Sequence, residues 1–324
     1  MTTRFLKTLL AASVPVVIVA ALFAIYIFSP VQPLDPRISI EKGTPLRIIS
    51  NRLGEKGIVK FPLLFLAYAE LSRKGKDLKA GEYLFEQTVS PRQVLDRLAK
   101  GLVEADKIRI IEGWTLNQIA DTLKNGGEIV RLAKDPAFIA SLNLKTPTLE
   151  GYLFPETYYL ETNAAPADYL KAFVKEFEKN YSAEIKELKT LPAYSKHQIM
   201  TLASIIEKET GSEAERNIIA SVFYNRLAKG MPLQSDPTII YGLKHFDGDI
   251  RKADITSRHP YNTYVHAGLP PGPICNPGLP SIKAALQPAQ TDYLYFVSKG
   301  DGTHYFSRTS TEHAEAVRKY QLKQ

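Results

Sequence analysis

The sequence predicts an α+β protein with an apolar amino-terminal segment, a small subdomain and a larger second domain. Three observations indicate this architecture: one long apolar run near the start, alternating short strand and helix patterns over residues 38–105, and a mostly helical pattern with a few strands over residues 106–324. With 324 residues and 44% hydrophobic content, the chain is long enough to bury a core in each of two domains.

The apolar run begins the chain, with no charged residue between Lys7 and Asp35. About 20 apolar residues suffice to span a bilayer. A cleaved signal peptide is the alternative, but the apolar core exceeds the roughly 7–15 residues of a signal peptide and no clean small-x-small cleavage site follows. We therefore expect an uncleaved transmembrane anchor at residues 8–29. The basic residues of the tail, residues 1–7, predict that it is cytoplasmic, which places the remainder on the extracytoplasmic, periplasmic side of the cell inner membrane.

Composition narrows the possible partners and cofactors. The 41 Lys+Arg against 34 Asp+Glu give a net charge of +7, which could favour anionic wall polymers or lipid headgroups, although a merely soluble basic surface explains it equally well. Nucleic acid is not an expected partner outside the cytoplasm. The single cysteine, Cys275, cannot form an internal disulfide and is expected to be a small buried hydrophobe. The six histidines show no HExxH-like spacing, so we expect neither a metal nor an organic cofactor.

After a linker at residues 30–37, the small subdomain spans residues 38–105. Capping residues and apolar periodicity predict the following elements: a strand at Ile38–Ile40, a helix after Thr44-Pro45 to Leu53, a helix at Phe61–Arg73, a strand at Gly81–Phe85, and a helix from Ser90-Pro91 to just before Gly101. Strand, glycine turn and helix with this spacing resemble the small glycan-binding LysM module, although many α+β hairpins would match the pattern.

The second domain opens with a similar unit, a strand at Lys107–Ile111 and a helix at Leu116–Leu123. An aromatic stretch, EGYLFPETYYL, follows at Glu150–Leu160, and Pro155 excludes an ordinary helix interior there. Its side chains could line a sugar cleft, because apolar faces of sugar rings pack on aromatic rings, or they could form a knot in the core. The residues concerned are Tyr152, Phe154, Tyr158 and Tyr159, with Glu156 as a further candidate substrate-binding residue of this motif.

A helix predicted over Ser195–Thr210 ends in two glutamates, Glu207 and Glu209. At roughly 100° per residue, Glu209 falls on the aliphatic stripe, whereas Glu207 turns aside. Burial favours the neutral, proton-donating form of a carboxylic acid, and the partial negative charge of the helix end acts in the same direction. Glu209 is therefore the predicted catalytic acid, and Glu207 is the alternative or a supporting partner.

A second helix follows at once. Ser212 and Glu215 have the spacing of a capping box, and the helix is expected to run to about Lys229. Two further stretches could face the acid: the turn before Pro237 and the proline- and glycine-rich loop Pro260–Gly278. The polar groups of this loop either hold a substrate or form hydrogen bonds with the loop's own backbone. The candidate substrate-binding residues are Asn225, Gln234, Ser235, Asp236, Tyr261, Asn262 and Tyr264, with Arg216 and Arg226 as surface ion-pair or sugar-binding residues.

The carboxyl-terminal part is expected to hold a helix, a hairpin and a closing helix. The predicted ranges are Ser281–Leu286, the strands Tyr293–Ser298 and His304–Ser307 around Gly300-Asp301-Gly302, and Ser310–Gln321.

Taken together, the segments ASIIEKET, VFYNRL, LQSDPTIIYG, PYNTY, GLPPGPICNPG and EGYLFPETY with one amino-terminal anchor resemble the endolytic murein transglycosylase, or YceG-like, family. The resemblance implies cleavage of the MurNAc–GlcNAc β-1,4 bond of peptidoglycan without water, leaving a 1,6-anhydro-MurNAc end. It also implies a LysM-like subdomain, action on new glycan strands near the membrane, wall synthases as neighbours, and the second glutamate of the E-K-E triplet, Glu209, as the catalytic residue.

One acid is sufficient for this chemistry. Protonated Glu209 would donate to the glycosidic oxygen and then, as carboxylate, take the proton from the C6 hydroxyl that attacks C1 of the same sugar. A hydrolase generally needs two carboxylates. The alternatives are a lysozyme-like muramidase, with Asp236 or Glu207 as the second carboxylate, and a membrane-anchored glycan-binding scaffold without turnover.

Overall fold

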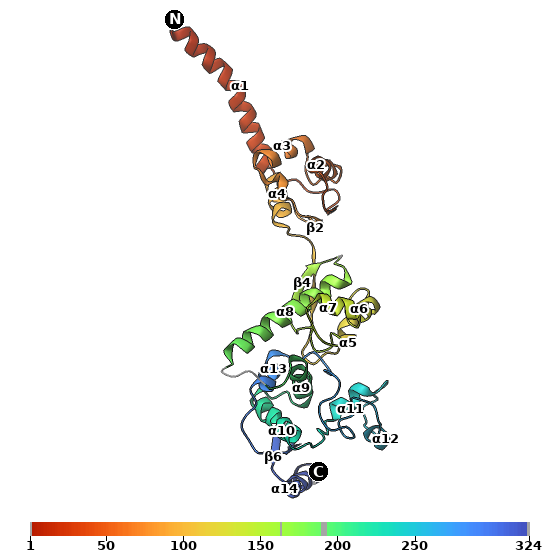
Figure 1. The fold of residues 1–324 in the computed structure, drawn as a ribbon. Coiled ribbons are helices and arrows are strands. Elements are labelled where there is room, and N and C mark those ends of the chain that lie inside the picture. The colour runs from red at the N-terminus through yellow and green to blue at the C-terminus, as the bar shows by residue number, and fades with distance from the viewer. Residues whose placement is uncertain (1, 163, 189–192, 323–324) are drawn as a thin grey trace. The chain divides into compact units, whose positions relative to one another are not determined.

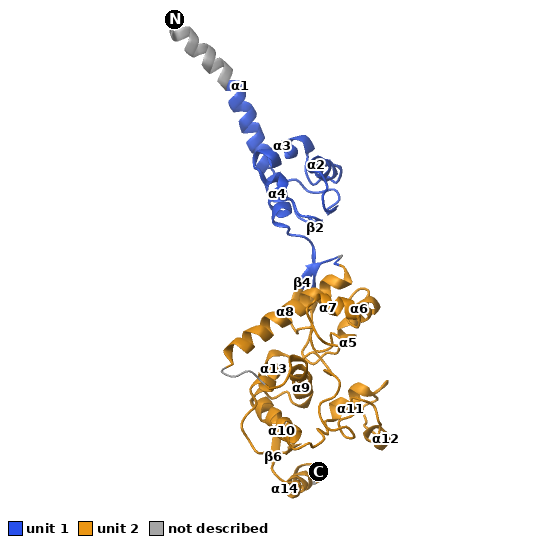
Figure 2. Cartoon of the chain, in the orientation of Figure 1, with its two compact units in different colours: residues 1–107, 159–164 blue, residues 108–158, 165–324 orange. Residues whose placement is uncertain are grey.

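The computed structural model describes the chain except residues 1, 163, 189–192 and 323–324, and for residues 2–13 it describes the backbone alone. It divides into two compact units: residues 1–107 with 159–164, and residues 108–158 with 165–324 (Figure 2). The predicted α+β class is confirmed, because helices predominate and the strands form three two-stranded sheets within the described part of the chain. The chain begins with helix α1 (Thr2–Phe28). Among the described residues, no helix combines the length and apolar character needed to span a membrane.

The first unit contains the elements predicted for the small subdomain, in the predicted order. They are β1 (Arg37–Ile40), α2 (Leu46–Glu55), α3 (Pro62–Leu71), a short 3-10 turn η1 (Lys74–Lys76), β2 (Gly81–Leu84) and α4 (Pro91–Lys100). β1 and β2 pair antiparallel, with Ile38 opposite Tyr83, and both side chains are buried. The Ser90–Gln93 capping box begins α4, and Gly101 in the left-handed region ends it, as the sequence indicates.

Two strands carry the chain between the units. β3 (Ala105–Arg109) and β4 (Thr157–Glu161) form a two-stranded sheet, and the boundary between the units falls within both strands. After β3, Gly113 adopts a positive φ of 76°, as Gly43 (φ 85°) does before α2, and each helix begins three residues after its glycine. The sequence echo between these two segments therefore corresponds to a shared local structure. The helix starts differ, because Thr115 caps α5 with its side chain and α2 has no side-chain cap.

The second unit is mainly helical (Figure 1). Helix α9 lies at its centre and buries every residue from Ile199 to Ile206, packing on α13, α10 and α11. The carboxyl-terminal hairpin packs on α14. The elements are α5 (Leu116–Asp121), α6 (Gly126–Leu132), α7 (Pro136–Ser141), α8 (Pro166–Glu187), α9 (Lys196–Glu209), η2 (Glu213–Glu215), α10 (Arg216–Ala228), α11 (Asp236–Gly242), α12 (Lys252–Ile255), α13 (Leu279–Leu286), β5 (Tyr295–Ser298), β6 (His304–Ser307) and α14 (Ser310–Tyr320).

One predicted helix start is wrong. Ser212 and Glu215 do not form a capping box: Ser212 makes no side-chain cap, and α10 begins after the 3-10 turn. The carboxylate of Glu215 instead contacts the backbone N–H and the ring of His304. A contact to a residue far along the chain has replaced the local one, which spacing in the sequence cannot reveal.

Candidate active site

Glu209 is the last residue of α9, where the chain leaves the core. Desolvation raises the pKa of its carboxyl to about 7, and the nearby charge of Asp236 acts in the same direction. A hydrogen bond from the Ser235 hydroxyl and the charge of Arg226 oppose the rise. The group is therefore close to half-protonated at neutral pH, which suits a residue that must both give and take a proton.

Helix α11 and the loop before it bring Ser235 to this acid. Ser235 is buried, and its hydroxyl donates a hydrogen bond to Oε1 of Glu209. Gln234 adopts a left-handed conformation (φ 52°), and its N–H donates to the carbonyl of Thr263 at 3.1 Å. The N–H of Ser235 donates to the hydroxyl of Thr263, also at 3.1 Å, so the predicted turn is clamped onto the Pro260–Gly278 loop.

A polar cavity of about 430 Å³ opens at Glu209. Tyr264 donates a hydrogen bond of 2.6 Å to Asp236, and both line the cavity. Arg226 also lines it and is buried, contrary to the surface ion pair that sequence suggested, because its guanidinium donates to the carbonyls of Leu233 and Leu294. The full lining is Glu209, Arg226, Leu233, Gln234, Asp236, Tyr264, Phe296, Val297, Ser298, His304, His313, Val317 and Gln321.

Glu207, the alternative acid, lies in a different environment. Its side chain is 7% exposed, its Oε1 lies 3.8 Å from the guanidinium of buried Arg216, and its Oε2 accepts a 3.0 Å hydrogen bond from the N–H of Gly278. Both glutamates are thus largely withdrawn from water. What separates them is their surroundings, because Glu207 lies in a buried ion pair with Arg216 and Glu209 lines the open cavity.

The structure therefore brings five of the predicted residues together: Glu209, Gln234, Ser235, Asp236 and Tyr264. Others lie elsewhere. Tyr152 and Phe154 are buried, with the Tyr152 ring packed edge-on against Phe177, so they occupy the core position that the sequence left as an alternative. Glu156 is exposed and accepts a hydrogen bond from the N–H of Thr157.

Two predicted amides serve the backbone. Asn225 donates to the carbonyls of Thr291 and Tyr293. Asn262 is buried and donates to three carbonyls of its own loop region, which is again the structural alternative. Tyr261 packs on Tyr241 at 4.8 Å and is not among the residues lining the Glu209 cavity.

Sequence reasoning missed a second buried carboxyl, Glu150. Burial raises its pKa to about 7, although it accepts hydrogen bonds from the N–H of Leu116 (2.9 Å), the amide of Asn276 (3.0 Å) and the hydroxyl of Tyr241 (3.2 Å). Asn276 in turn accepts from two N–H groups of the aromatic stretch. Because its carboxyl is occupied by these groups and Glu150 is not among the residues lining the Glu209 cavity, we interpret Glu150 as a structural acid.

The sequence also did not indicate His304 and His313 of the carboxyl-terminal hairpin and helix, because they reach the Glu209 cavity only through tertiary packing. Among the described residues, no group of three or more His, Cys, Asp or Glu side chains is arranged to hold a metal ion. Cys275 is buried, as expected, and burial raises the pKa of its thiol.

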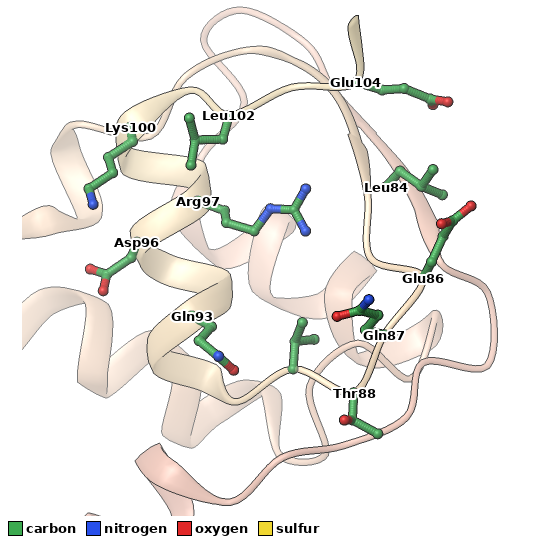
Figure 3. Close-up of a pocket in the computed structure, with 11 residues that line it drawn as sticks. Leu84, Glu86, Gln87, Thr88, Gln93, Asp96, Arg97, Lys100, Leu102 and Glu104 are labelled. Atoms are coloured by element: carbon green, nitrogen blue, oxygen red, sulfur yellow. The ribbon is translucent and has the colours of Figure 1, made fainter.

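The first unit carries a larger cavity of about 640 Å³ between α4 and the segment after β2. Figure 3 shows Arg97 extending from α4 into this space, with Gln93, Asp96 and Lys100 along the same helix. The guanidinium of Arg97 lies 4.9 Å from the ring centre of Phe85. The carboxyl that burial shifts to a pKa of about 7 in a cavity wall is that of Glu209, so we treat the Glu209 cavity as the candidate active site.

A mixed α+β fold that holds a desolvated carboxylic acid in the wall of an open polar cavity is typical of an acid–base enzyme. The chain belongs to the YceG-like family, whose model matches residues 38–319. It is 36% identical over 309 residues to the endolytic murein transglycosylase of Bacillus subtilis, covering 87% of this chain and 84% of that protein. It is 30% identical over 335 residues to the endolytic murein transglycosylase of Streptococcus pneumoniae, covering 90% of this chain and 60% of the relative. A crystal structure of a YceG-like protein from Listeria monocytogenes matches with a TM-score of 0.57 and 36% identity, covering 86% of this chain and 97% of that one.

Proposed function

We propose that this protein is an endolytic lytic transglycosylase that cleaves the MurNAc–GlcNAc β-1,4 bond of peptidoglycan and leaves a 1,6-anhydro-MurNAc end. The observation that carries the proposal is the environment of Glu209, a desolvated carboxylic acid with a pKa of about 7 that lines a polar cavity. The names of the relatives from B. subtilis and S. pneumoniae support the same reaction.

In the first step, protonated Glu209 donates its proton to the glycosidic oxygen, and the bond between that oxygen and C1 breaks. Desolvation makes the protonated form available near neutral pH. In the second step, the Glu209 carboxylate takes the proton of the C6 hydroxyl of the same MurNAc. At the same time the oxygen of that C6 hydroxyl forms a bond to C1. The attack is intramolecular, so it gains from proximity and needs no second carboxylate to activate water.

Ser235 and Arg226 support the charged form between these steps. The Ser235 hydroxyl donates to Oε1 of Glu209, and the positive charge of Arg226 also favours the carboxylate. The acid is thus poised between two opposing influences, and each proton transfer changes its charge at moderate cost.

A lysozyme-like hydrolase is the second candidate, because Asp236 lines the same cavity and could activate water. Asp236 accepts a hydrogen bond from Tyr264, which fixes its orientation. The single-acid mechanism is favoured by the relatives' names.

The setting of the reaction is also part of the proposal. The uncharged stretch between Lys7 and Asp35 supports a membrane anchor at residues 8–29, with the catalytic domain on the periplasmic side of the inner membrane. The strand, helix, helix, strand order of the first unit supports a LysM-like subdomain that binds glycan. Cleavage near the membrane would then terminate new strands beside the wall synthases.

In the decisive experiment, purified sacculi are digested with the full-length wild type, with Glu209→Gln and with Glu207→Gln as a matched control. The products are identified by mass spectrometry. We expect 1,6-anhydro-MurNAc ends from the wild type and from Glu207→Gln, and none from Glu209→Gln. Products with reducing ends would establish the hydrolase instead. Wild-type cleavage by folded Glu209→Gln would refute the assignment of the acid, and binding of sacculi without any product from the wild type would indicate the scaffold.

A further inference from the structure

The Glu209 cavity has a second set of lining residues that the proposed proton transfers do not use. They come from the carboxyl-terminal hairpin and from α14, more than 80 residues along the chain from the acid. They include apolar side chains and potential hydrogen-bonding groups: Phe296, Val297, Ser298, His304, His313, Val317 and Gln321. A substrate that reaches Glu209 must therefore also meet this part of the wall.

His304 is held in place by contacts of its backbone and of its ring. Both oxygens of Glu215 contact it: Oε1 accepts from its backbone N–H at 3.0 Å, and Oε2 lies 2.7 Å from ring atom Nδ1. Its ring also packs edge-on against Phe296, with the centroids 5.5 Å apart. The side chains of His304 and Glu215 are 12% and 14% exposed, so the pair is largely shielded from water.

This arrangement determines what the imidazole offers to the cavity. A carboxylate beside Nδ1 requires the proton on Nδ1, so in a neutral ring the other nitrogen, Nε2, is a hydrogen-bond acceptor. No hydrogen bond to Nε2 is present among the residues that the structure describes. With the proton on Nδ1, Nε2 of this ring is an acceptor that no described residue occupies, so it can take a hydrogen bond from a ligand in the cavity that His304 lines.

We propose that His304 is a substrate-binding residue of the Glu209 cavity and that Glu215 is the positioning residue that orients it. Nε2 of His304 accepts a hydrogen bond from a hydroxyl or an amide N–H of the glycan strand, groups that N-acetylated sugars carry in every residue. The inference rests on the proposed function, which supplies the substrate class, and it adds the β5–β6 hairpin to the substrate site.

Two replacements of His304 separate a role in substrate binding from a structural role, because each places an amide group near the position of a different ring nitrogen. His304→Asn places its amide near Nδ1 and can still donate to Glu215, but it has no atom at Nε2. His304→Gln places its amide near Nε2 but loses the bond to Glu215. We expect the KM for solubilised glycan strands to rise about tenfold in His304→Asn, which is the worth of one good hydrogen bond, and to rise less in His304→Gln. His245→Asn, at an exposed position, is the matched control and should leave KM unchanged.

Glu215→Gln tests the positioning role. A glutamine can still accept from the backbone N–H of His304, but its amide donates to Nδ1 and moves the ring proton to Nε2, which turns the acceptor into a donor. The expected result is a raised KM with the kcat within about threefold of the wild type and an unchanged melting temperature. Glu213→Gln, an exposed neighbour, is the control.

A purely structural role predicts the opposite ranking. His304→Asn would then behave as the wild type, and His304→Gln would lose thermal stability. That ranking would overturn the inference. An unchanged KM in Glu215→Gln would also overturn it. Binding of undigested strands to Glu209→Gln, alone and combined with His304→Asn, separates the two hypotheses. Weaker binding in the double variant supports the inference, and equal binding refutes it. The KM measurements on the His304 and Glu215 variants do not depend on Glu209 being the acid, which the product analysis tests by itself.

Discussion

Ser235 donates a hydrogen bond to Oε1 of Glu209. This bond stabilises the carboxylate of Glu209, a group whose pKa is raised by burial. Burial and the charge of Asp236 favour the acid, whereas Ser235 and Arg226 favour the carboxylate. The balance leaves the pKa at about 7. A group that serves first as acid and then as base needs such a balance, because a strong bias either way would slow one of the steps.

Removing the donor should shift the pH dependence upward. In Ser235→Ala the carboxylate of Glu209 loses a hydrogen bond, so its pKa rises above about 7 and the protonated enzyme persists to higher pH. We expect the alkaline limb of kcat/KM, measured by the release of anhydro products, to move to higher pH, with a lower kcat because the carboxylate is less stabilised. Ser141→Ala, which removes an exposed hydroxyl, should leave the profile unchanged. A limb that stays in place would show that Glu209 does not set it.

Removing the neighbouring charge should shift the same limb in the opposite direction. Asp236→Asn keeps an acceptor for the Tyr264 hydroxyl but removes the negative charge that raises the pKa of Glu209. The limb should move to lower pH, with activity at its optimum within about tenfold of the wild type, since a single-acid mechanism does not need this carboxylate. Asp249→Asn is an exposed control. A loss of about a thousandfold at every pH would favour the hydrolase, in which Asp236 acts on water.

Glu207 should matter for stability and little for chemistry. In Glu207→Leu the guanidinium of Arg216 loses its partner in a buried position, and the variant should lose about 3 kcal/mol of stability. Adding Arg216→Met removes the unpaired charge and should restore part of the melting temperature. Thermal unfolding followed by circular dichroism measures both. If the single variant melts as the wild type does, the ion pair does not hold the corner between α9 and α10.

Glu150 predicts a pH-dependent stability. Its pKa in the folded protein, about 7, lies above the ordinary value of 4.5, so the folded state holds the proton more tightly. The proton on Glu150 therefore stabilises the folded state by at most about 3 kcal/mol. This stabilisation is fully present below about pH 4.5 and is lost as the pH rises through 7.

Glu150→Gln keeps an oxygen to accept from Leu116 and Asn276 and cannot ionise. The variant should match the wild type at pH 5 and unfold at a higher temperature than the wild type at pH 8. Glu156→Gln, at an exposed position, is the control and should follow the wild type at both values. A parallel pH dependence in wild type and Glu150→Gln would contradict the assignment.

The positions of Glu209 and Ser235 in the candidate site were predictable because their signals are local. The aliphatic stripe of α9 and its end indicated Glu209, and the residues before Pro237 indicated the turn that brings Ser235 to it. Aromatic residues were less informative. Tyr152 and Tyr264 have the same side chain, but Tyr152 packs in the core and Tyr264 lines the Glu209 cavity. Hydrophobic and sugar-binding uses of an aromatic ring share one sequence signature, so only packing distinguishes them.

Local pattern thus determined the α+β class, most helix ends, and the place of Glu209 on the apolar stripe at the end of α9, since capping, periodicity and burial of a stripe depend on neighbours in the chain. Tertiary structure alone decided the rest. It paired Glu207 with Arg216 through the corner between α9 and α10, drew Glu215 away from Ser212 to His304, and placed the carboxyl-terminal hairpin in the wall of the Glu209 cavity. These contacts join residues whose separation in sequence carries no information about distance, because they form only when α9, α10 and the hairpin pack together.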